Sequence, residues 1–246
     1  MKRITVVLLA VFLAGTTLPA VAADSDARAV EIAEAVLERL GGRQAWEATR
    51  YIRWDFFGSR THYLDKHTGD VRIEIPERRN DAGDLQRPEL LVLMNVHTKQ
   101  GRVWAAGEPA EGEKLQEYLD EGHQVWINDS YWMFMPYKLL DPGVTLRYAG
   151  ERELEDGRPC DALDMTFGDG VGYTPENRYV VCVARDTGLV EQWSFFAEAG
   201  DEQARFTLPW GGWSQFGRIW LATEHGQGKD WKIAVEADMP RALFTE

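Results

Sequence analysis

Residues 126–143 read WINDSYWMFMPYKLLDPG and form the most distinctive stretch of this 246-residue sequence. A polar island at 128–130 lies inside a run that is otherwise strongly apolar and aromatic. Glu111 and Glu113 favour a helix N-terminus, and Pro136 lacks a backbone donor, so a helix has to end near it. The apolar positions between them follow helical spacing, and they are Leu115, Tyr118, Leu119, Gly122 and Trp126. The sequence therefore predicts one long helix from about Glu111 to Pro136.

Two interpretations fit the apolar end of this helix. It can form a lid or plug over an apolar cavity, because Met and aromatic side chains give an adaptable surface. It can also be a buried helix end, in which Asn128 and Asp129 cap neighbouring backbone. Lys138 could neutralise Asp129 or meet an anionic headgroup. The candidate ligand-binding residues are Trp126, Tyr131, Trp132, Phe134, Met135 and Tyr137. The candidates for a polar opening of the cavity are Asn128, Asp129 and Lys138.

On both sides of this helix the apolar period changes to that of strands. Residues 71–75 alternate cleanly, which is typical of a strand with one buried face. Three short polar turns, 66–70, 97–101 and 185–188, each place a glycine late, where a hairpin needs a positive φ. A second amphipathic helix over 25–40 precedes the strands. The sequence therefore predicts an α+β domain, with one antiparallel sheet of about ten strands and two helices packed on one face.

The first residues indicate export. A positively charged start precedes an apolar run at 4–15, and Ala20-Val21-Ala22 is a small-x-small cleavage site. The run is shorter than the roughly 20 residues that a membrane-spanning helix needs. We therefore expect residues 1–22 to be a cleaved signal peptide, and residues 23–246 to be a soluble periplasmic domain without a transmembrane span.

Charge and cysteine content restrict the partners. The chain has 27 Lys+Arg and 40 Asp+Glu, a formal net charge of −13. This argues against a nucleic-acid partner, because phosphate binding needs a clustered basic face, and against simple electrostatic docking on anionic lipid. Export permits a disulfide between Cys160 and Cys182, provided that their two strands are near neighbours. Both the bonded and the free state remain open at this point.

Catalytic and metal-binding patterns are missing from the sequence, which has no G-x-S-x-G, HExxH, P-loop or EF-hand. His62, Asp65 and His67 form H-x-x-D-x-H, but strand alternation separates His62 from the other two. We expect all three to be solvent-facing side chains near a hairpin, and the acids of 153–164 to form a solvated hairpin rim. We therefore expect no metal, no cofactor and no enzymatic activity, with a hydrolase of envelope lipid or glycan as the enzymatic alternative.

Several segments together resemble the outer-membrane lipoprotein-sorting superfamily, the LolA/LolB-like fold. Gly41-Gly42-x-x-Ala45-Trp46 follows the first helix, and Asp238-x-Pro240-x-x-Leu243-Phe244 lies near the C-terminus. WINDSYW at 126–132 and the PYKLLDPG segment at 136–143 resemble a periplasmic branch of this superfamily. The resemblance covers roughly Val30 to Phe244.

This resemblance carries expectations about fold and function. It implies a strongly curved, unclosed antiparallel half-barrel whose helices cap a concave, apolar face. It also implies a non-enzymatic periplasmic carrier that binds a hydrophobic small molecule, a lipid or a lipid-modified protein in that cavity. The alternative is an envelope protein–protein interaction or stress-sensing module with no bound lipid.

Overall fold

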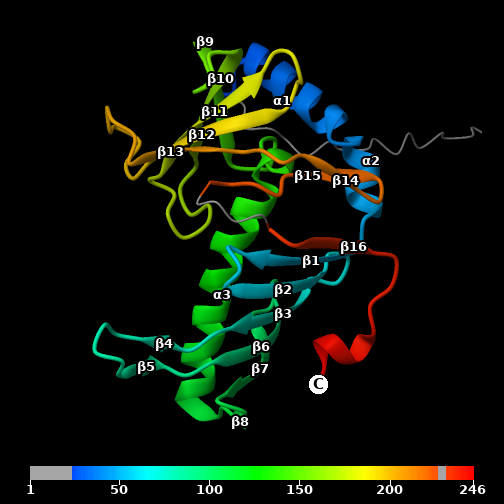
Figure 1. Ribbon diagram of the computed structural model, residues 1–246, viewed down its shortest axis with the longest axis vertical. Helices are drawn as coiled ribbons and strands as arrows, with labels where there is room; N and C mark the ends of the chain where they lie inside the picture. The colour runs from blue at the N-terminus through cyan, green and yellow to red at the C-terminus, as the bar shows by residue number, and fades with distance from the viewer. Residues whose placement is uncertain (1–23, 227–230) are drawn as a thin grey trace, which may run out of the picture.

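The computed structural model describes residues 24–226 and 231–246 (Figure 1). The expected signal peptide, 1–22, lies outside the described residues. The helices of the described part are α1 (Ala27–Arg39), α2 (Gly42–Ala48) and α3 (Gly112–Phe134), with 3-10 turns η1 (Met135–Tyr137) and η2 (Arg241–Phe244). The long helix predicted to end near Pro136 is thus present as α3, whereas α2 was not predicted.

The strands form two principal sheets, both antiparallel. The larger has seven strands in the order β16 (Ile233–Glu236), β1 (Tyr51–Phe56), β2 (Arg60–Asp65), β3 (Asp70–Ile75), β6 (Leu90–Asn95), β7 (Gln100–Ala105) and β8 (Glu108–Pro109). The smaller has five in the order β13 (Phe206–Pro209), β12 (Val190–Phe196), β11 (Arg178–Ala184), β10 (Pro159–Phe167) and β9 (Val144–Glu153). Two separate hairpins are β4 (Arg78–Arg79) with β5 (Leu85–Arg87), and β14 (Ser214–Phe216) with β15 (Ile219–Leu221).

The α+β class and the antiparallel pairing are confirmed, but the single half-barrel sheet of about ten strands is not. The chain leaves the larger sheet after β8, a two-residue strand that ends at Pro109. Proline donates no ladder hydrogen bond, so a sheet stops readily at such an edge. The chain then forms α3 before β9 begins the second sheet, and the two sheets stay separate.

Helix α3 connects the two sheets, and it runs past the strands of the larger one before it reaches the smaller (Figure 1). Its first half packs on β6, where an added Cβ on Gly122 would lie 2.9 Å from Val92 Cγ1. A side chain there would push the helix from the sheet, so glycine permits the close contact. In its second half Trp132 meets the Trp193 ring of β12 at 4.6 Å. The apolar end of α3 thus lies between the sheets.

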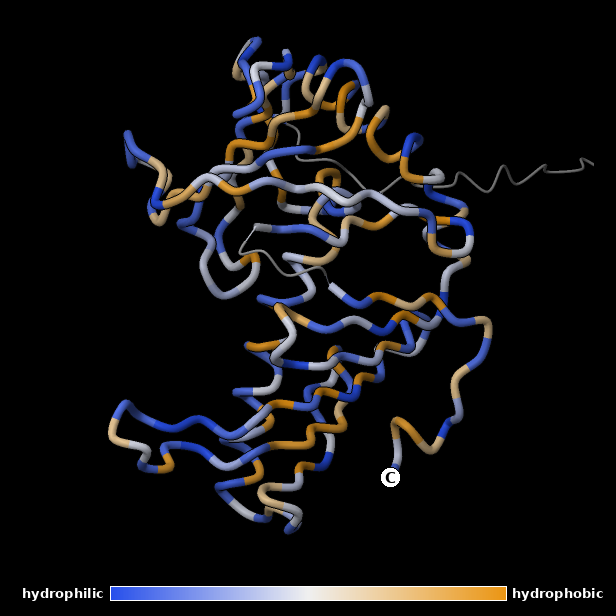
Figure 2. Tube along the Cα trace, in the orientation of Figure 1, coloured by the Kyte–Doolittle hydropathy of each residue, from blue (hydrophilic) through white to orange (hydrophobic). Residues whose placement is uncertain are grey.

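Apolar residues recur along the strands and along α1 in the hydropathy colouring of Figure 2. The buried face of α1 consists of Ala29, Ile32, Ala33, Val36 and Leu37, which is the amphipathic pattern predicted from sequence. Two of the predicted hairpin turns place glycine in the left-handed region, with φ of 77° at Gly69 and 69° at Gly188. In the third turn Lys99 (φ 56°), and not Gly101, takes that conformation.

Candidate functional site

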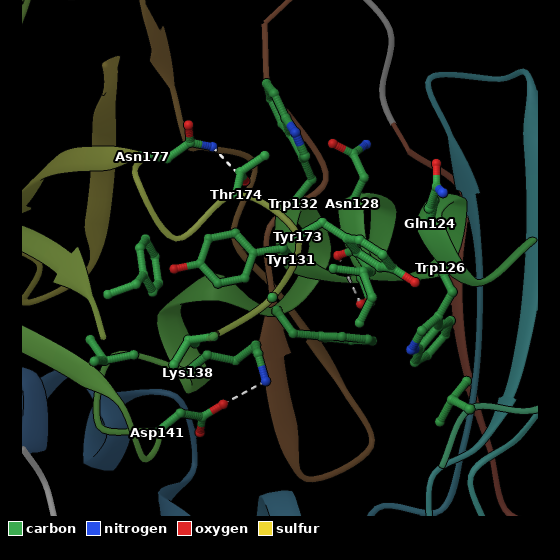
Figure 3. A pocket seen from close by; sticks show the side chains of 18 of the residues that line it. Gln124, Trp126, Asn128, Tyr131, Trp132, Lys138, Asp141, Tyr173, Thr174 and Asn177 are labelled. Atoms are coloured by element: carbon green, nitrogen blue, oxygen red, sulfur yellow. Dashed lines mark hydrogen bonds and ion pairs between the residues drawn. The ribbon is translucent and has the colours of Figure 1, made fainter. Parts of the chain in front are cut away.

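A cavity of about 920 Å³ lies between the two sheets, along the second half of α3 (Figure 3). Both sheets, α2, α3 and the loop at 168–177 contribute to its wall. The wall is rich in aromatic residues, which are Trp46, Trp126, Tyr131, Trp132, Phe134, Phe167, Tyr173, Tyr179, Trp193, Phe195 and Phe206. Aromatic side chains provide large apolar contact surfaces and pack against one another in tilted and stacked geometries. The cavity is therefore suited to an apolar ligand.

Six of the candidate residues predicted from sequence line this cavity, and they are Trp126, Asn128, Tyr131, Trp132, Phe134 and Lys138. Met135 and Tyr137 do not. The Met135 side chain is fully buried in the core. The Tyr137 hydroxyl lies 2.9 Å from the Leu40 carbonyl oxygen and 2.8 Å from that of Trp220, so this residue fastens η1 to neighbouring backbone.

The polar island is divided between the cavity and the core. Asn128 lines the cavity, whereas Asp129 is fully buried beside β2. Arg60 donates two hydrogen bonds to the Asp129 carboxylate, from Nε at 2.7 Å and from Nη2 at 2.8 Å. His62 Nε2 lies 2.8 Å from the same carboxylate, and Asn128 Nδ2 donates to it at 2.9 Å. These contacts fix the C-terminal part of α3 to the larger sheet.

The protonation states within this cluster follow from burial and pairing. Burial lowers the pKa of His62 against the opposing effect of Asp129, so the ring is neutral at pH 7 and its Nε2–H donates to the carboxylate. Burial acts to raise the pKa of Asp129, but hydrogen bonds from His62 and Arg60 outweigh it, and the pKa lies below its ordinary value. Asp129 is therefore ionised, and the cluster is an anchor for the helix that forms the cavity wall.

The structure excludes one of the two alternatives for Lys138 and shows that the expected exposure of His62 and Asp65 was wrong. Lys138 does not neutralise Asp129, because its Nζ pairs with Asp141 Oδ2 at 2.5 Å, as Figure 3 shows. His62 and Asp65 are not solvent-facing, since both are buried, and Asp65 accepts two hydrogen bonds from Arg50. His67 lies beyond the end of β2, in the turn that leads to β3, and it is exposed. Residues from other elements cover His62 and Asp65, and sequence periodicity does not reveal such contacts.

The aromatic residues that β10, β11, β12 and β13 contribute to the cavity were also missed. Phe167, Tyr179, Trp193, Phe195 and Phe206 come from these strands. The available signal was the density of aromatic residues in strands that were expected only to form hairpins. Their shared orientation toward α3 depends on strand pairing, which single-strand periodicity does not specify.

Cys160 and Cys182 are both free and buried, on neighbouring strands β10 and β11. They belong to a small apolar cluster that is separate from the cavity lining. Burial raises the pKa of the Cys160 thiol and raises that of Cys182 to about 12. Both thiols are therefore protonated and unreactive at neutral pH.

Within residues 24–226 and 231–246, no helix is long and apolar enough to cross a membrane. Nor do three His, Cys, Asp or Glu side chains of that part gather where they could hold a metal ion.

The polar side chains at the cavity mostly bond other protein groups. Ser130 Oγ donates to the Ile127 carbonyl at 3.3 Å, and His123 Nδ1 lies 2.6 Å from the Tyr173 hydroxyl.

Comparisons with known proteins gave matches only among solved structures, because no protein-family model and no curated protein matches the chain. A DUF1329 family protein from Desulfovibrio piger is 15% identical, with 88% of this chain and 96% of that chain covered and a TM-score of 0.41. A LolA superfamily protein from Nitrosomonas europaea is 11% identical, with 87% and 97% covered and a TM-score of 0.37. This chain is similar in structure to LolA superfamily proteins.

The superfamily that the sequence resembles is thus represented among the matched structures. A third match, the structure of MucB, is 16% identical with a TM-score of 0.28, and the match covers 89% of this chain but only 62% of that one. All three identities are below 25% and all three TM-scores are below 0.5. The function is therefore inferred below from the side chains of this chain.

Proposed function

We propose that this protein is an exported, periplasmic binding protein that carries a hydrophobic ligand, such as a lipid or the acyl chain of a lipoprotein, between its two sheets. The observation that carries the proposal is the aromatic cavity of about 920 Å³ along α3. Ligand pockets commonly measure about 300–1,000 Å³ and are mostly apolar with a few placed polar groups. The cavity fits this description in both size and lining.

The energetics of burial favour an apolar occupant. Each buried CH₂ group contributes about 0.8 kcal/mol, so ten methylenes would contribute roughly 8 kcal/mol before the costs of binding. Lys138 and Asp141, the oppositely charged pair on the wall, neutralise each other. An apolar chain could therefore lie against most of this wall without desolvating an unpaired charge.

The proposal includes binding without turnover. Ser130 of α3 lines the cavity, and its Oγ bonds the backbone of its own helix and not a histidine. His123 faces the Tyr173 hydroxyl, and burial lowers its pKa. A hydrolase would need a nucleophile held by a base and a group that orients the base. Turnover of a lipid ester that a single substitution of His123 abolishes would replace this proposal by an enzymatic one.

Two substitutions separate the cavity wall from the core. Trp132→Ala should weaken binding of the apolar fluorescent probe N-phenyl-1-naphthylamine about tenfold, because it removes a wall residue that packs on Trp193 at 4.6 Å. Met135→Ala should instead lower the free energy of unfolding by about 2–5 kcal/mol, because its side chain is fully buried outside the cavity. Probe titrations and urea unfolding of both variants measure the two effects.

The matched control is Trp104→Ala, since Trp104 is a half-buried tryptophan of β7 that does not line the cavity. Its probe affinity should equal that of the wild type. Equal losses of affinity for Trp104→Ala and Trp132→Ala would contradict a site at the cavity. Mass spectrometry of extracts from protein purified without detergent tests the proposal directly. A stoichiometric acyl species would support it, whereas an empty protein that takes up no probe would overturn it.

A second candidate, docking of another envelope protein, is favoured by the β4–β5 arm. This arm projects from the larger sheet and is mostly hydrophilic (Figures 1 and 2). Leu85 on the arm is an exception, with 51% of its surface exposed. If the cavity is empty, Leu85→Ser should abolish capture of an envelope partner by the purified protein while probe uptake stays absent.

A further inference from the structure

Two hairpin turns that are far apart in the sequence lie side by side at one edge of the larger sheet. The turn at 66–69 joins β2 to β3, and the turn at 96–99 joins β6 to β7. Because β3 pairs with β6, the turns meet, and the Val96 N–H donates to the Gly69 carbonyl at 2.9 Å. An added Cβ on Gly69 would lie 2.4 Å from His97 Cδ2, so the second turn packs directly on the first.

This junction gathers basic side chains, and we call it the basic rim. It consists of Lys66, His67, His97 and Lys99 from the two turns, with His123 of α3 beside them. Lys66, His97 and His123 line the aromatic cavity. Lys99 Nζ lies 3.5 Å from the Tyr173 hydroxyl, which also contacts His123. The rim therefore forms part of the cavity wall.

The charge of Lys66 is not neutralised by the protein. Its side chain is half-buried, its Nζ lies 4.9 Å from the centre of the Trp46 ring, and its nearest bonded oxygen is the Glu47 carbonyl at 3.4 Å. Among the described residues no carboxylate lies within ion-pair distance of it, although the exposed Glu47 side chain exerts some attraction. Burial lowers the pKa of Lys66, which shows that the protein environment alone disfavours its charge.

The carboxylates that flank the first turn already have partners. Asp65 pairs with Arg50 at 2.8 Å, and Asp70 pairs with Arg241 at 2.9 Å. The one carboxylate on the cavity wall, Asp141, pairs with Lys138. A chain of net charge −13 thus presents uncompensated positive charge at the border of its apolar cavity. Such a local reversal of sign favours an anionic group at that position.

We propose that the ligand is an anionic amphiphile, with its apolar tail in the cavity and its phosphate or carboxylate head on the basic rim, held principally by Lys66 and His97. The inference rests on the proposed function, because the tail needs the cavity. It adds that the ligand has a charged head and that the head lies at the edge where the two turns meet. Neutral and cationic amphiphiles of equal length should bind less tightly.

Displacement of N-phenyl-1-naphthylamine from the intact protein tests this proposal. The competitors are dodecyl phosphate, dodecanol and dodecyltrimethylammonium, each below its micelle concentration, and inorganic phosphate. Dodecyl phosphate should displace the probe at about a tenfold lower concentration than dodecanol, as one charge-assisted contact contributes that much. Dodecyltrimethylammonium should be weaker than dodecanol, and millimolar inorganic phosphate should displace nothing.

The double variant Lys66→Gln, His97→Gln should bring the ratio of the two affinities, for dodecyl phosphate and for dodecanol, close to one. Lys114→Gln is the matched control, since Lys114 lies exposed on α3 away from the cavity and should leave that ratio unchanged. A probe that does not bind at all overturns the proposed function itself. If the probe binds but dodecyl phosphate and dodecanol displace it equally well, only the proposal of an anionic head is overturned. Displacement by inorganic phosphate would instead indicate a site for free phosphate.

Discussion

Asp129→Ala is expected to lower the free energy of unfolding by about 3–5 kcal/mol, the usual cost of removing one partner from a buried ion pair. The carboxylate is fully buried and accepts hydrogen bonds from Arg60, His62 and Asn128. Without it, the Arg60 side chain, which is 24% exposed, and the buried His62 ring lose their partner. Urea unfolding followed by tryptophan fluorescence measures the change.

The sign of the pH dependence gives an independent check on this anchor. The pKa of Asp129 is lower in the folded protein than its ordinary value, so its stabilising effect is present above about pH 4 and is lost as the pH falls below that. The unfolding free energy of Asp129→Ala should lack this loss of stability at acidic pH. Asp120→Ala, an exposed substitution on the same helix, should stay within about 0.5 kcal/mol of the wild type. Equal effects for the two variants would show that the cluster is no anchor.

Acidification from pH 7 to pH 5 should destabilise the protein by about 2 kcal/mol through His225 alone. The ring is fully buried between Trp210, at 4.5 Å, and Trp231, at 4.1 Å. Within the described residues neither of its ring nitrogens has a hydrogen-bond partner. Burial lowers the pKa of His225 to about 3, so the unfolded chain binds the proton first and stability falls as the pH drops below about 6.5.

His225→Leu tests this origin because leucine is apolar and similar in volume. The variant should lose most of the change in unfolding free energy between pH 7 and pH 5. A smaller share should remain from His62, whose pKa is lowered by burial in the same direction. His67→Gln, at an exposed histidine, should leave the full change in place. A wild-type stability that is constant across this range would refute the assignment.

Local patterns predicted the elements well where neighbours along the chain set the structure. The strand predicted at 71–75 is present as β3, because alternation is a property of one strand. The helix before Pro136 ends as expected, since proline blocks the next turn wherever it lies. Trp126 and Trp132 reach the cavity as predicted, because the helix carries them there.

The predictions failed where a partner from a distant part of the chain decides the outcome. Lys138, nine positions along the chain, was one candidate partner for Asp129, but Asp129 bonds Arg60 of β2 instead. Met135 was grouped with the cavity residues because it is apolar, but its side chain is fully buried in the core. Apolar residues favour any dry environment, so hydrophobicity alone does not distinguish a cavity wall from a core.

The sequence by itself determined the antiparallel hairpins, the two amphipathic helices and the aromatic content that a cavity requires, because each follows from local spacing and side-chain chemistry. Only the tertiary structure decided that the strands divide into two sheets, and that α3 passes between them. It also brought the turn of Lys66 beside the turn of His97, through the pairing of β3 with β6. Such contacts depend on strand pairing and on burial against distant elements, which no single segment of the chain encodes.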